Sequence, residues 1–270
     1  MDKIVTIGSS TVHHGKHNNR AYIMSFDKSD GSAALETVEV LAQKEGYTKI
    51  VAKIPETKLR LFEMKNYRTE GTIKNSRNER FYFVAKYLSD KRKHIENLTE
   101  IKEIIKAAEE SGPKEEPAGF VIRRLTEGDI DDQIKIYKAV FKSYPFPIYD
   151  KGFIKETMKD SVNYYGVFED GEMIATSSAD IDRKTGCAEM TDFATLPSHR
   201  GRGFAPALLE KMEEDLAKAG VRSYFTIARS VSYGMNKTFA RAGYEYSGTL
   251  YNNTNINGGM ESMNIWYKVV

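Results

Sequence analysis

The sequence is short of cysteine, of net charge and of long apolar runs. Its one cysteine, Cys187, excludes a disulfide within the chain and fits a reducing compartment. The net charge is only +2, with acidic and basic residues intermixed, so neither nucleic acid nor a membrane is expected as a partner. No apolar run approaches membrane-spanning length, and the polar start Met1-Asp2-Lys3 lacks a signal-peptide core. We therefore expect a cytoplasmic protein.

The composition supplies enough apolar material for a folded core. Of the 270 residues, 40% are hydrophobic and 29% are charged, which allows one large core or two modest ones. Residues 111–119 combine glycine, proline and acidic residues, and they follow a charged helical pattern over 91–110. We interpret 111–119 as a linker between an N-terminal half-domain, 1–110, and a second domain, 120–270. The charged pattern is interpreted as a solvated helix rather than an interaction tail.

The second domain alternates strand and helix patterns, which favours an α/β or α+β domain around one sheet. Its clearest hairpin signal is Asp170-Gly171, a dipeptide typical of tight two-residue turns. We predict strands at 120–124, 164–169, 172–182, 189–196, 223–228, 246–252 and 262–269, and helices at 129–141, 151–159, 205–219 and 236–242.

The loop at 198–205 carries the strongest functional motif. Gly201 and Gly203 can adopt backbone angles that turn successive N–H groups inward, and the following helix adds the positive end of its dipole. Arg200 and Arg202 add charge at the rim. The loop is neither a P-loop nor a dinucleotide fingerprint, because the residues that complete those motifs are missing. It predicts a diphosphate cradle, although a tight turn with solvated arginines would use the same residues.

Two motifs resemble those of the Gcn5-related N-acetyltransferase (GNAT) superfamily. Its acyl-coenzyme A signature is matched by Arg200, Gly203 and Ala205, and its helix beside the pantetheine arm is matched by Asn236 and Phe239. The resemblance covers 120–270 and implies a mixed central sheet, acetyl-CoA as cosubstrate and direct attack in a ternary complex. The coenzyme contacts that we expect are Phe193, Ala194, Thr195, Arg200, Gly201, Arg202, Gly203, Phe204, Ala205, Asn236 and Phe239. An N–H group within 193–195 would polarise the thioester carbonyl.

More narrowly, residues 144–147 and 248–268 resemble the β-lysine Nε-acetyltransferases. That resemblance implies acetyl transfer to the ε-amine of β-lysine, and a product that serves as a compatible solute in osmoadaptation. Other small amines such as a polyamine or α-lysine remain alternatives. So do a non-catalytic coenzyme-binding regulatory module and, more weakly, acetylation of protein lysines.

The chemistry requires a base, because a lysine-type ammonium has a pKa near 10.4. The family often places a carboxylate on the strand before the phosphate loop, and here we favour Asp192 over Glu189. Strand alternation puts these two side chains on opposite faces unless a bulge intervenes. Many family members have a tyrosine that protonates the departing thiolate, but this chain has Phe239 at that position. Tyr233 is the substitute candidate for this general acid. The alternative is that Tyr233 only packs at the start of a helix. Cys187 is not expected to carry an acyl group.

Substrate contacts are expected from the family-specific segments. An amino-acid substrate needs partners for its carboxylate and amines, which asparagine and glutamate can supply in part. The candidates are Tyr144, Phe146, Asn252, Asn253, Asn255 and Glu261. A surface hairpin rich in asparagine and aromatics that cover the core are the alternatives. No metal is expected, because the loop that carries His13, His14 and His17 supplies no acidic or cysteine partner.

The first 90 residues resemble the end of the chain. Residues 41–52 are similar to 216–228, residues 59–71 to the helix and strand ending at Gly248, and residues 81–86 to 263–268. We interpret them as a degenerate second copy of half of the acetyltransferase fold. The alternative is that the two stretches are unrelated and only have a similar order of strands and helices. Residues 27–34 replace the phosphate loop there, so no coenzyme is expected in the first copy. The half-domain could also build a homodimer.

Overall fold

The computed structural model describes residues 2–112 and 119–270. The first part forms a six-stranded sheet in the order β1-β2-β3-β4-β6-β5. Its strands are β1 (Lys3–Ile7), β2 (Ser10–Gly15), β3 (Arg20–Ser25), β4 (Lys49–Pro55), β5 (Arg68–Lys74) and β6 (Arg80–Tyr87). Its helices are α1 (Ser32–Lys44), α2 (Leu59–Glu63), α3 (Asp90–Lys93) and α4 (Leu98–Glu109), with a short 3-10 turn, Glu56–Lys58, before α2.

The second part forms a seven-stranded sheet in the order β12-β13-β11-β10-β9-β8-β7. Its strands are β7 (Val121–Arg124), β8 (Val162–Glu169), β9 (Glu172–Asp182), β10 (Cys187–Thr195), β11 (Ser223–Arg229), β12 (Glu245–Ile256) and β13 (Gly259–Val269). Its helices are α5 (Ile130–Val140), α6 (Lys151–Asp160), α7 (Phe204–Lys218) and α8 (Tyr233–Arg241), and 3-10 turns lie at Glu127–Asp129 and Pro197–His199. Parallel pairing of β10 with β11 and antiparallel pairing elsewhere confirm the expected mixed sheet.

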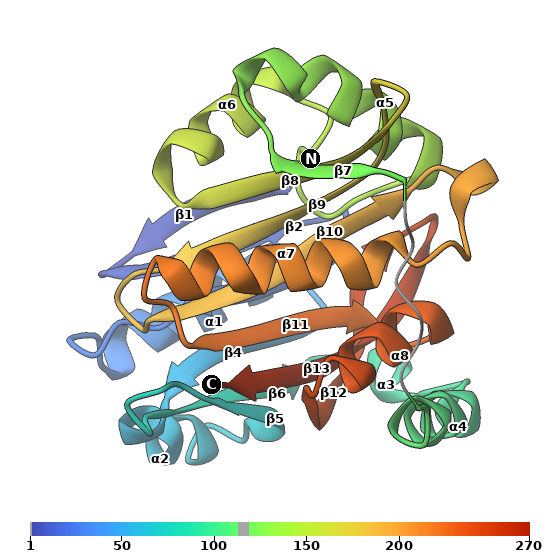
Figure 1. The fold of residues 1–270 in the computed structure, drawn as a ribbon. Coiled ribbons are helices and arrows are strands. Elements are labelled where there is room, and N and C mark those ends of the chain that lie inside the picture. Colours follow the sequence, from blue (N-terminus) through green and yellow to red (C-terminus); the bar gives the residue numbers. More distant parts are fainter. Residues whose placement is uncertain (1, 113–118) are drawn as a thin grey trace.

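The two sheets pack face to face. Phe83 and Val51 of the first sheet share one apolar cluster with Phe225 and Ile265 of the second. Helices α1 and α2 cover the outer face of the first sheet, while α7 and α8 cover the outer face of the second. In Figure 1, α7 lies in front of the second sheet and the first sheet lies behind it. The inner face of the second sheet therefore has two covers, α5 and α6 at one end and the first sheet at the other.

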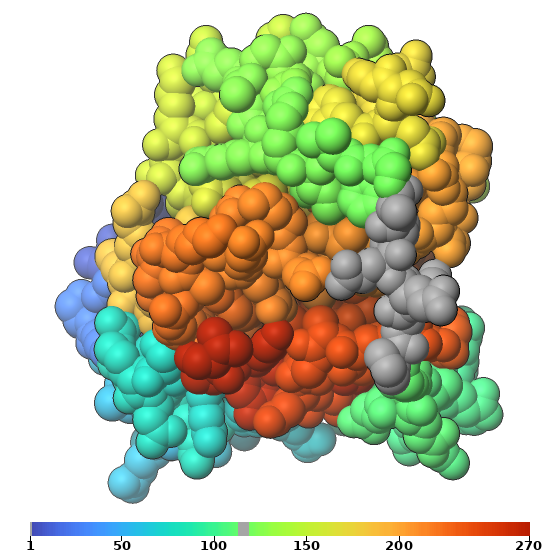
Figure 2. All heavy atoms as spheres, in the orientation of Figure 1, coloured from blue at the N-terminus to red at the C-terminus, as the bar shows by residue number. Residues whose placement is uncertain are grey.

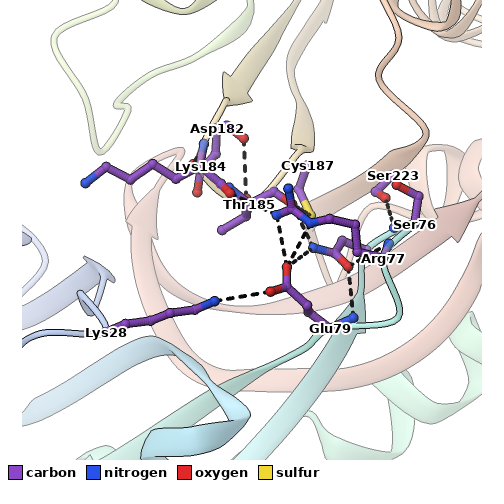
Figure 3. A network of polar contacts seen from close by, with 10 residues as sticks. Lys28, Ser76, Arg77, Glu79, Asp182, Lys184, Thr185, Cys187 and Ser223 are labelled. Atoms are coloured by element: carbon purple, nitrogen blue, oxygen red, sulfur yellow. Dashed lines mark hydrogen bonds and ion pairs between the residues drawn. The ribbon is translucent and has the colours of Figure 1, made fainter.

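Figure 2 shows the same view with side chains, where α7 lies at the surface between the segment around β7 and the C-terminal strand. Away from that surface, turns of the two parts bind one another. The Arg77 side chain donates to the Lys184 carbonyl at 2.9 Å, and the Ser76 N–H donates to the Ser223 hydroxyl at 2.6 Å. Figure 3 shows how this network joins the β5–β6 turn to the β9–β10 turn. Polar contacts thus supplement the apolar interface.

The strand order of the first sheet reappears in the second. Read from β5, the first sheet runs β5-β6-β4-β3-β2-β1, and six strands of the second run β12-β13-β11-β10-β9-β8. In each sheet one parallel pair, β3 with β4 or β10 with β11, is joined through a helix. Where the second copy has its glycine loop, the first has Asp30, whose carboxylate accepts from the Ser9 N–H at 3.0 Å. The shared strand order covers more than the half of the fold that the sequence comparison suggested, and origin by duplication stays our interpretation.

Most predicted elements are present with ends shifted by a few residues. The helix expected over 91–110 is instead two helices, because the chain leaves helical geometry at His94, the residue that follows α3. Helix α4 is not simply solvated, since Ile101, Ile105 and Ala108 on it are buried where it packs on α8. Most of the predicted linker, residues 113–118, lies outside the described residues. Among the helices that are described, none is long and apolar enough to cross a membrane.

Candidate active site

A cavity of about 1010 Å³ opens where β10 and β11 separate. The two strands pair in parallel from Cys187 with Ser223 to Glu189 with Phe225, and the pairing ends there. Beyond that point the cavity is walled by the ends of both strands, the loop before α7, helix α8, the end of α5 with the loop after it, and the β12–β13 turn. The loop that the sequence marked as a diphosphate cradle therefore lies at a large opening in the sheet.

A β-bulge places Asp192 in this cavity. The register of β10 with β9 shifts between Thr191 and Ala194, and Asp192 has a φ of 56°. The bulge interrupts strand alternation, so Thr191, Asp192 and Phe193 all line the cavity. Ala194 is buried in the core beside α5 and does not line it.

The Asp192 carboxylate is held by two hydroxyl groups. The Tyr144 hydroxyl donates to one oxygen at 2.5 Å, and the Ser178 hydroxyl donates to the other at 2.6 Å. Burial raises the pKa of Asp192 above its usual range, while these hydrogen bonds act in the opposite direction. A buried carboxylate with a raised pKa is a better proton acceptor than an exposed one.

Glu189, the competing candidate base, lies elsewhere. It lines a separate small cavity of about 60 Å³ between the two sheets, beside Tyr22, Lys53 and Asp180. Burial raises the pKa of Glu189 to about 7, and Lys53 opposes that rise. The carboxyl group cannot reach an amine bound in the large cavity from this position, so the geometry favours Asp192.

The glycine loop has the backbone that its sequence predicts. Gly201 and Gly203 have φ angles of 80° and 89°, and Gly203 directly precedes the first turn of α7. A Cβ built on Gly201 would have no atom within 4 Å, so open space lies over the loop. The first N–H groups of a helix have no acceptor within it, and those of Phe204 and Ala205 begin α7 at the cavity wall. Diphosphate binding at this loop stays a prediction that this geometry supports.

The two loop arginines differ. Arg200 lines the cavity, and its Nε donates to the Thr195 carbonyl at 3.3 Å. Arg202 points away instead, where it pairs with Glu169 at 2.9 Å and stacks over the ring of Phe204. Arg202 is not among the residues that line the cavity, so we no longer expect its side chain to contact the coenzyme, and binding by the backbone N–H groups of 201–205 stays a prediction.

The cavity wall is strongly basic, which sequence reasoning missed beyond the loop. Asp192 is the one acidic residue among the described residues that line it. The lysines and arginines on the wall are Lys138, Lys142, Arg200, Arg229, Lys237 and Arg241. Such a surplus of cations suits a ligand with several phosphate groups. These cations come from separate segments of the chain, so no local sequence motif predicts that they lie together.

Asn236 is a structural residue, and its predicted coenzyme contact is corrected. It is fully buried, and its amide NH₂ donates to the carbonyls of Arg229 and Ser232 at 3.0 and 2.8 Å. Its amide oxygen accepts from Asn264 at 2.8 Å and from the Trp266 indole at 2.9 Å. With every group bonded within the fold, Asn236 has nothing left for a ligand.

The two aromatic candidates on α8 also differ. Phe239 lines the cavity and meets Phe193 edge to face, with ring centres 5.6 Å apart. Tyr233 is 45% exposed and its hydroxyl accepts from Lys237 at 3.1 Å. Because Tyr233 does not line the cavity, its predicted role as a general acid is corrected.

The asparagine-rich segment joins the two parts of the chain rather than lining the cavity. A wide bulge in β12 between Leu250 and Thr254 leaves backbone carbonyls without sheet partners. Three buried cations of the first part donate to successive carbonyls there: Lys49 to Tyr251 at 2.8 Å, Arg92 to Asn252 at 2.5 Å and Arg20 to Asn253 at 2.7 Å.

The asparagine side chains contribute to the same contact between the β12 bulge and the first part of the chain, which we call the seam. The Asn252 amide donates to the His94 carbonyl at 2.7 Å, and the Asn255 amide donates to the His17 carbonyl at 2.9 Å. Asn253 is buried, and its amide donates to Thr254. The predicted substrate contacts of Asn252, Asn253 and Asn255 are corrected, since none of them lines the cavity and the side chains of Asn252 and Asn255 bind the first part of the chain.

Of the remaining substrate candidates, only one lines the cavity. Tyr144 lines the cavity as expected, whereas Phe146 stacks on His13 of the first part, with ring centres 4.6 Å apart. Glu261 does not line the cavity, but it binds Arg229, which does, through contacts of 2.8 and 2.6 Å. The expected role of Glu261 is thus indirect, and that of Phe146 is corrected.

The chain resembles known acetyltransferases over different spans. The model of the Acetyltransferase (GNAT) family matches residues 131–244. The chain is 37% identical to "Beta-lysine N(6)-acetyltransferase" of Methanococcus maripaludis, over 100% of this chain and 99% of that protein. It is 30% identical to "N-acetyltransferase YodP" of Bacillus subtilis, over 96% of each. A solved N-acetyltransferase from Staphylococcus aureus Mu50 shares the fold, with a TM-score of 0.50 at 16% identity, over 56% of this chain and 99% of that one.

Proposed function

The chain belongs to the acetyltransferase (GNAT) family, and we propose that it transfers the acetyl group of acetyl-CoA to the ε-amine of β-lysine. The full-length likeness to a β-lysine N(6)-acetyltransferase supports the substrate. The observation that carries the chemistry is Asp192, a partly buried carboxylate held in the same cavity as the glycine loop.

Acetyl-CoA fits the residues of the cavity and supplies the activated acetyl group. The loop of Gly201 and Gly203, the start of α7 and Arg200 beside them would hold its phosphates. Phe193 and Phe239 offer apolar surface beside them. A backbone N–H within residues 193–195, beyond the end of β10–β11 pairing, would polarise the thioester carbonyl.

Asp192 would accept the proton that the ε-ammonium must lose before its nitrogen attacks. The hydroxyl groups of Tyr144 and Ser178 fix the carboxylate, and holding both reactants in one cavity favours direct transfer without a covalent enzyme intermediate. Neither Phe239 nor Tyr233 can protonate the departing sulfur, so we assign that proton to solvent.

A polyamine is a poorer candidate for this cavity. Polyamines carry several positive charges, whereas the described wall has six lysines and arginines and one carboxylate. β-Lysine carries one carboxylate against two amines, and acetylation of the ε-amine leaves a product with no net charge. A neutral, highly soluble product suits the proposed role as a compatible solute in osmoadaptation.

The test is an assay with acetyl-CoA and a panel of β-lysine, α-lysine, ornithine and spermidine, with products identified by mass spectrometry. We expect β-lysine acetylated on its ε-amine to dominate. In parallel, Asp192→Asn should lower kcat by two to four orders of magnitude and leave the Kd of acetyl-CoA nearly unchanged, as about 10²–10⁴-fold is typical for loss of a general base. Acetylation of another panel member in preference to β-lysine would overturn the proposed substrate.

A further inference from the structure

The inner face of the second sheet carries the groups that can meet an amine acceptor. Alternation along β11 places Tyr224 and Ala228 beneath α7, and Phe225 and Ile227 toward the first sheet. Arg229 follows Ile227 by two positions and therefore lies on that inner face. Arg229 is also one of the residues that line the large cavity.

Asp192 faces the same way. On β9, the Ser177 hydroxyl donates to Met212 of α7, so Ser178, the next residue, lies on the opposite, inner face. Ser178 is the residue that binds the Asp192 carboxylate, and Tyr144 reaches it from the loop after α5, a helix that also covers the inner face. Asp192 and Arg229 thus share one face of the sheet and one cavity.

Arg229 is fixed by Glu261 on the neighbouring strand. Its Nε and Nη2 donate to the two carboxylate oxygens at 2.8 and 2.6 Å, with side-chain exposures of 27% for Arg229 and 16% for Glu261. A guanidinium has five N–H donors, and this fork uses two of them. The remaining N–H donors of Arg229 are therefore held in a fixed orientation for a ligand in the cavity. The negative charge of Glu261 offsets the desolvation cost of the partly buried guanidinium.

The other cations of the wall are less suited to the acceptor. Lys138, Lys142 and Arg200 are exposed to solvent, which weakens a single ionic contact. Lys237 and Arg241 lie on α8, which packs on the outer face of the sheet together with α7. Arg229 combines the inner face, partial burial and a fixed orientation.

We propose that Arg229, oriented by Glu261, binds the carboxylate of the acceptor, so that the enzyme selects amino acids over amines that lack a carboxylate. This inference rests on the proposed acetyl transfer and adds to it the residue that sets the substrate class. Asp192 receives the reacting amine and Arg229 receives the far end of the same molecule. Oriented hydrogen bonds to a carboxylate discriminate strongly, because an analogue without it leaves buried donors unpaired.

The experiment compares kcat/KM for β-lysine with that for its carboxamide, which keeps both amines and the shape but removes the negative charge. Wild-type protein should prefer the acid by about tenfold to a hundredfold. Arg229→Gln should reduce kcat/KM for β-lysine by about that factor and change the value for the carboxamide by less than about threefold. Arg229→Lys, which keeps the charge without the fork, should recover only part of the preference.

Two further variants and a binding measurement control the result. Arg229→Gln combined with Glu261→Gln removes both charges, so a loss seen there cannot come from an unpaired Glu261. Arg241→Gln removes a wall cation on the other face and should leave the preference for the acid unchanged. The Kd of acetyl-CoA from calorimetry and the thermal melt should stay close to wild type in the Arg229 variants.

The outcomes separate this inference from the proposed function. Equal losses for acid and carboxamide, or no loss for either, would overturn the role of Arg229 while acetylation of β-lysine stands. If the wild-type protein prefers α-lysine or ornithine, the proposed substrate is wrong, and the same comparison is made with that amino acid and its amide. Acetylation of spermidine alone would overturn both.

Discussion

Gly71 and Gly248 lie against each other across the two sheets. A Cβ added to Gly248 would come within 2.7 Å of the Gly71 Cα, and Gly248 has a φ of 154°. Each glycine lies at a β-bulge: the register of β5 shifts between Thr69 and Gly71, and that of β12 shifts between Tyr246 and Gly248. Matched bulges in matched strands therefore allow the two backbones to approach more closely than side chains would permit.

We expect Gly248→Ala to lower the free energy of unfolding by about 2–4 kcal/mol, since the new methyl group meets backbone atoms that cannot move aside. Urea unfolding of the full chain measures the change. Gly259→Ala is the matched control, because a Cβ there would meet no atom within 4 Å, and it should change stability by less than about 1 kcal/mol. Equal stability of the two variants would contradict the close packing of the sheets at this point.

Local patterns made much of the fold predictable. Alternating apolar residues and the Asp170-Gly171 dipeptide predicted a hairpin, and β9 spans Glu172–Asp182 with both turn residues at positive φ. The seam between the two parts was not predictable, because Arg20 and Asn253 are 233 positions apart in sequence. An asparagine-rich segment carries no local sign that distant cations will bind its carbonyls.

The same distinction applies to the candidate site. The positive φ angles of Gly201 and Gly203 follow from their own chemistry and their place before a helix, so the loop could be predicted. Asn236 matched a family motif, yet its surroundings depend on Trp266, which lies in another strand. The Arg229–Glu261 pair joins two strands, and strand alternation beside the motif strand was the signal that could have drawn attention to Arg229.

The glycine loop can be tested by coenzyme affinity. Gly203→Val should raise the Kd of acetyl-CoA about tenfold or more, roughly 1.4 kcal/mol, because valine resists the φ of 89° that presents the loop N–H groups. Gly186→Val is the matched control, since Gly186 has a φ of 70° but lies in the β9–β10 turn. Calorimetry should show wild-type affinity for the control. Unchanged affinity in a folded Gly203→Val protein would remove the loop from the binding site.

The hydrogen bond from Tyr144 to Asp192 predicts a shift in the pH profile. That bond favours the ionised carboxylate, so Tyr144→Phe should raise the pKa of Asp192 further above its usual range. Because the base works only when ionised, the acidic limb of kcat/KM should move to higher pH by about one unit. Tyr149→Phe removes a hydroxyl that donates to the Phe141 carbonyl instead, and it should leave the limb in place. A limb that stays fixed in Tyr144→Phe would mean that another group titrates.

Glu189 predicts a pH-dependent change in stability rather than in catalysis. Burial raises its pKa to about 7 in the folded protein from 4.5, so folding disfavours the ionised form. The penalty is absent below about pH 4.5, grows as pH rises between the two values, and is complete above about pH 7. Glu189→Gln should therefore gain stability relative to wild type by roughly 2–3 kcal/mol between pH 5 and pH 8, as urea unfolding at both pH values would show. A constant difference at the two pH values would contradict a raised pKa for this carboxyl in the folded protein.

The first part of the chain is predicted to be needed for the stability of the second. Phe225, Leu250 and Ile265 of the second sheet are buried against the first sheet, and the carbonyls of the β12 bulge depend on its buried cations. An excised fragment of residues 119–270 would expose this apolar face and leave those carbonyls without protein donors.

We expect that fragment to aggregate or to melt at a markedly lower temperature than the full chain, although its glycine loop and Asp192 are both present. Light scattering, a thermal melt and the kinetics of both proteins measure this. Within the full chain, Lys49→Met should act in the same direction, because Lys49 is fully buried and bonds both Glu70 and the Tyr251 carbonyl at 2.8 Å. Losing it leaves the Glu70 carboxylate without its buried counter-ion, while the Tyr87 hydroxyl still donates to Glu70 and, at 3.2 Å, to that carbonyl. Removing one partner costs about 3–5 kcal/mol in comparable buried ion pairs. A monodisperse fragment with the melting temperature and activity of the full chain would show instead that the first part is an independent appendage.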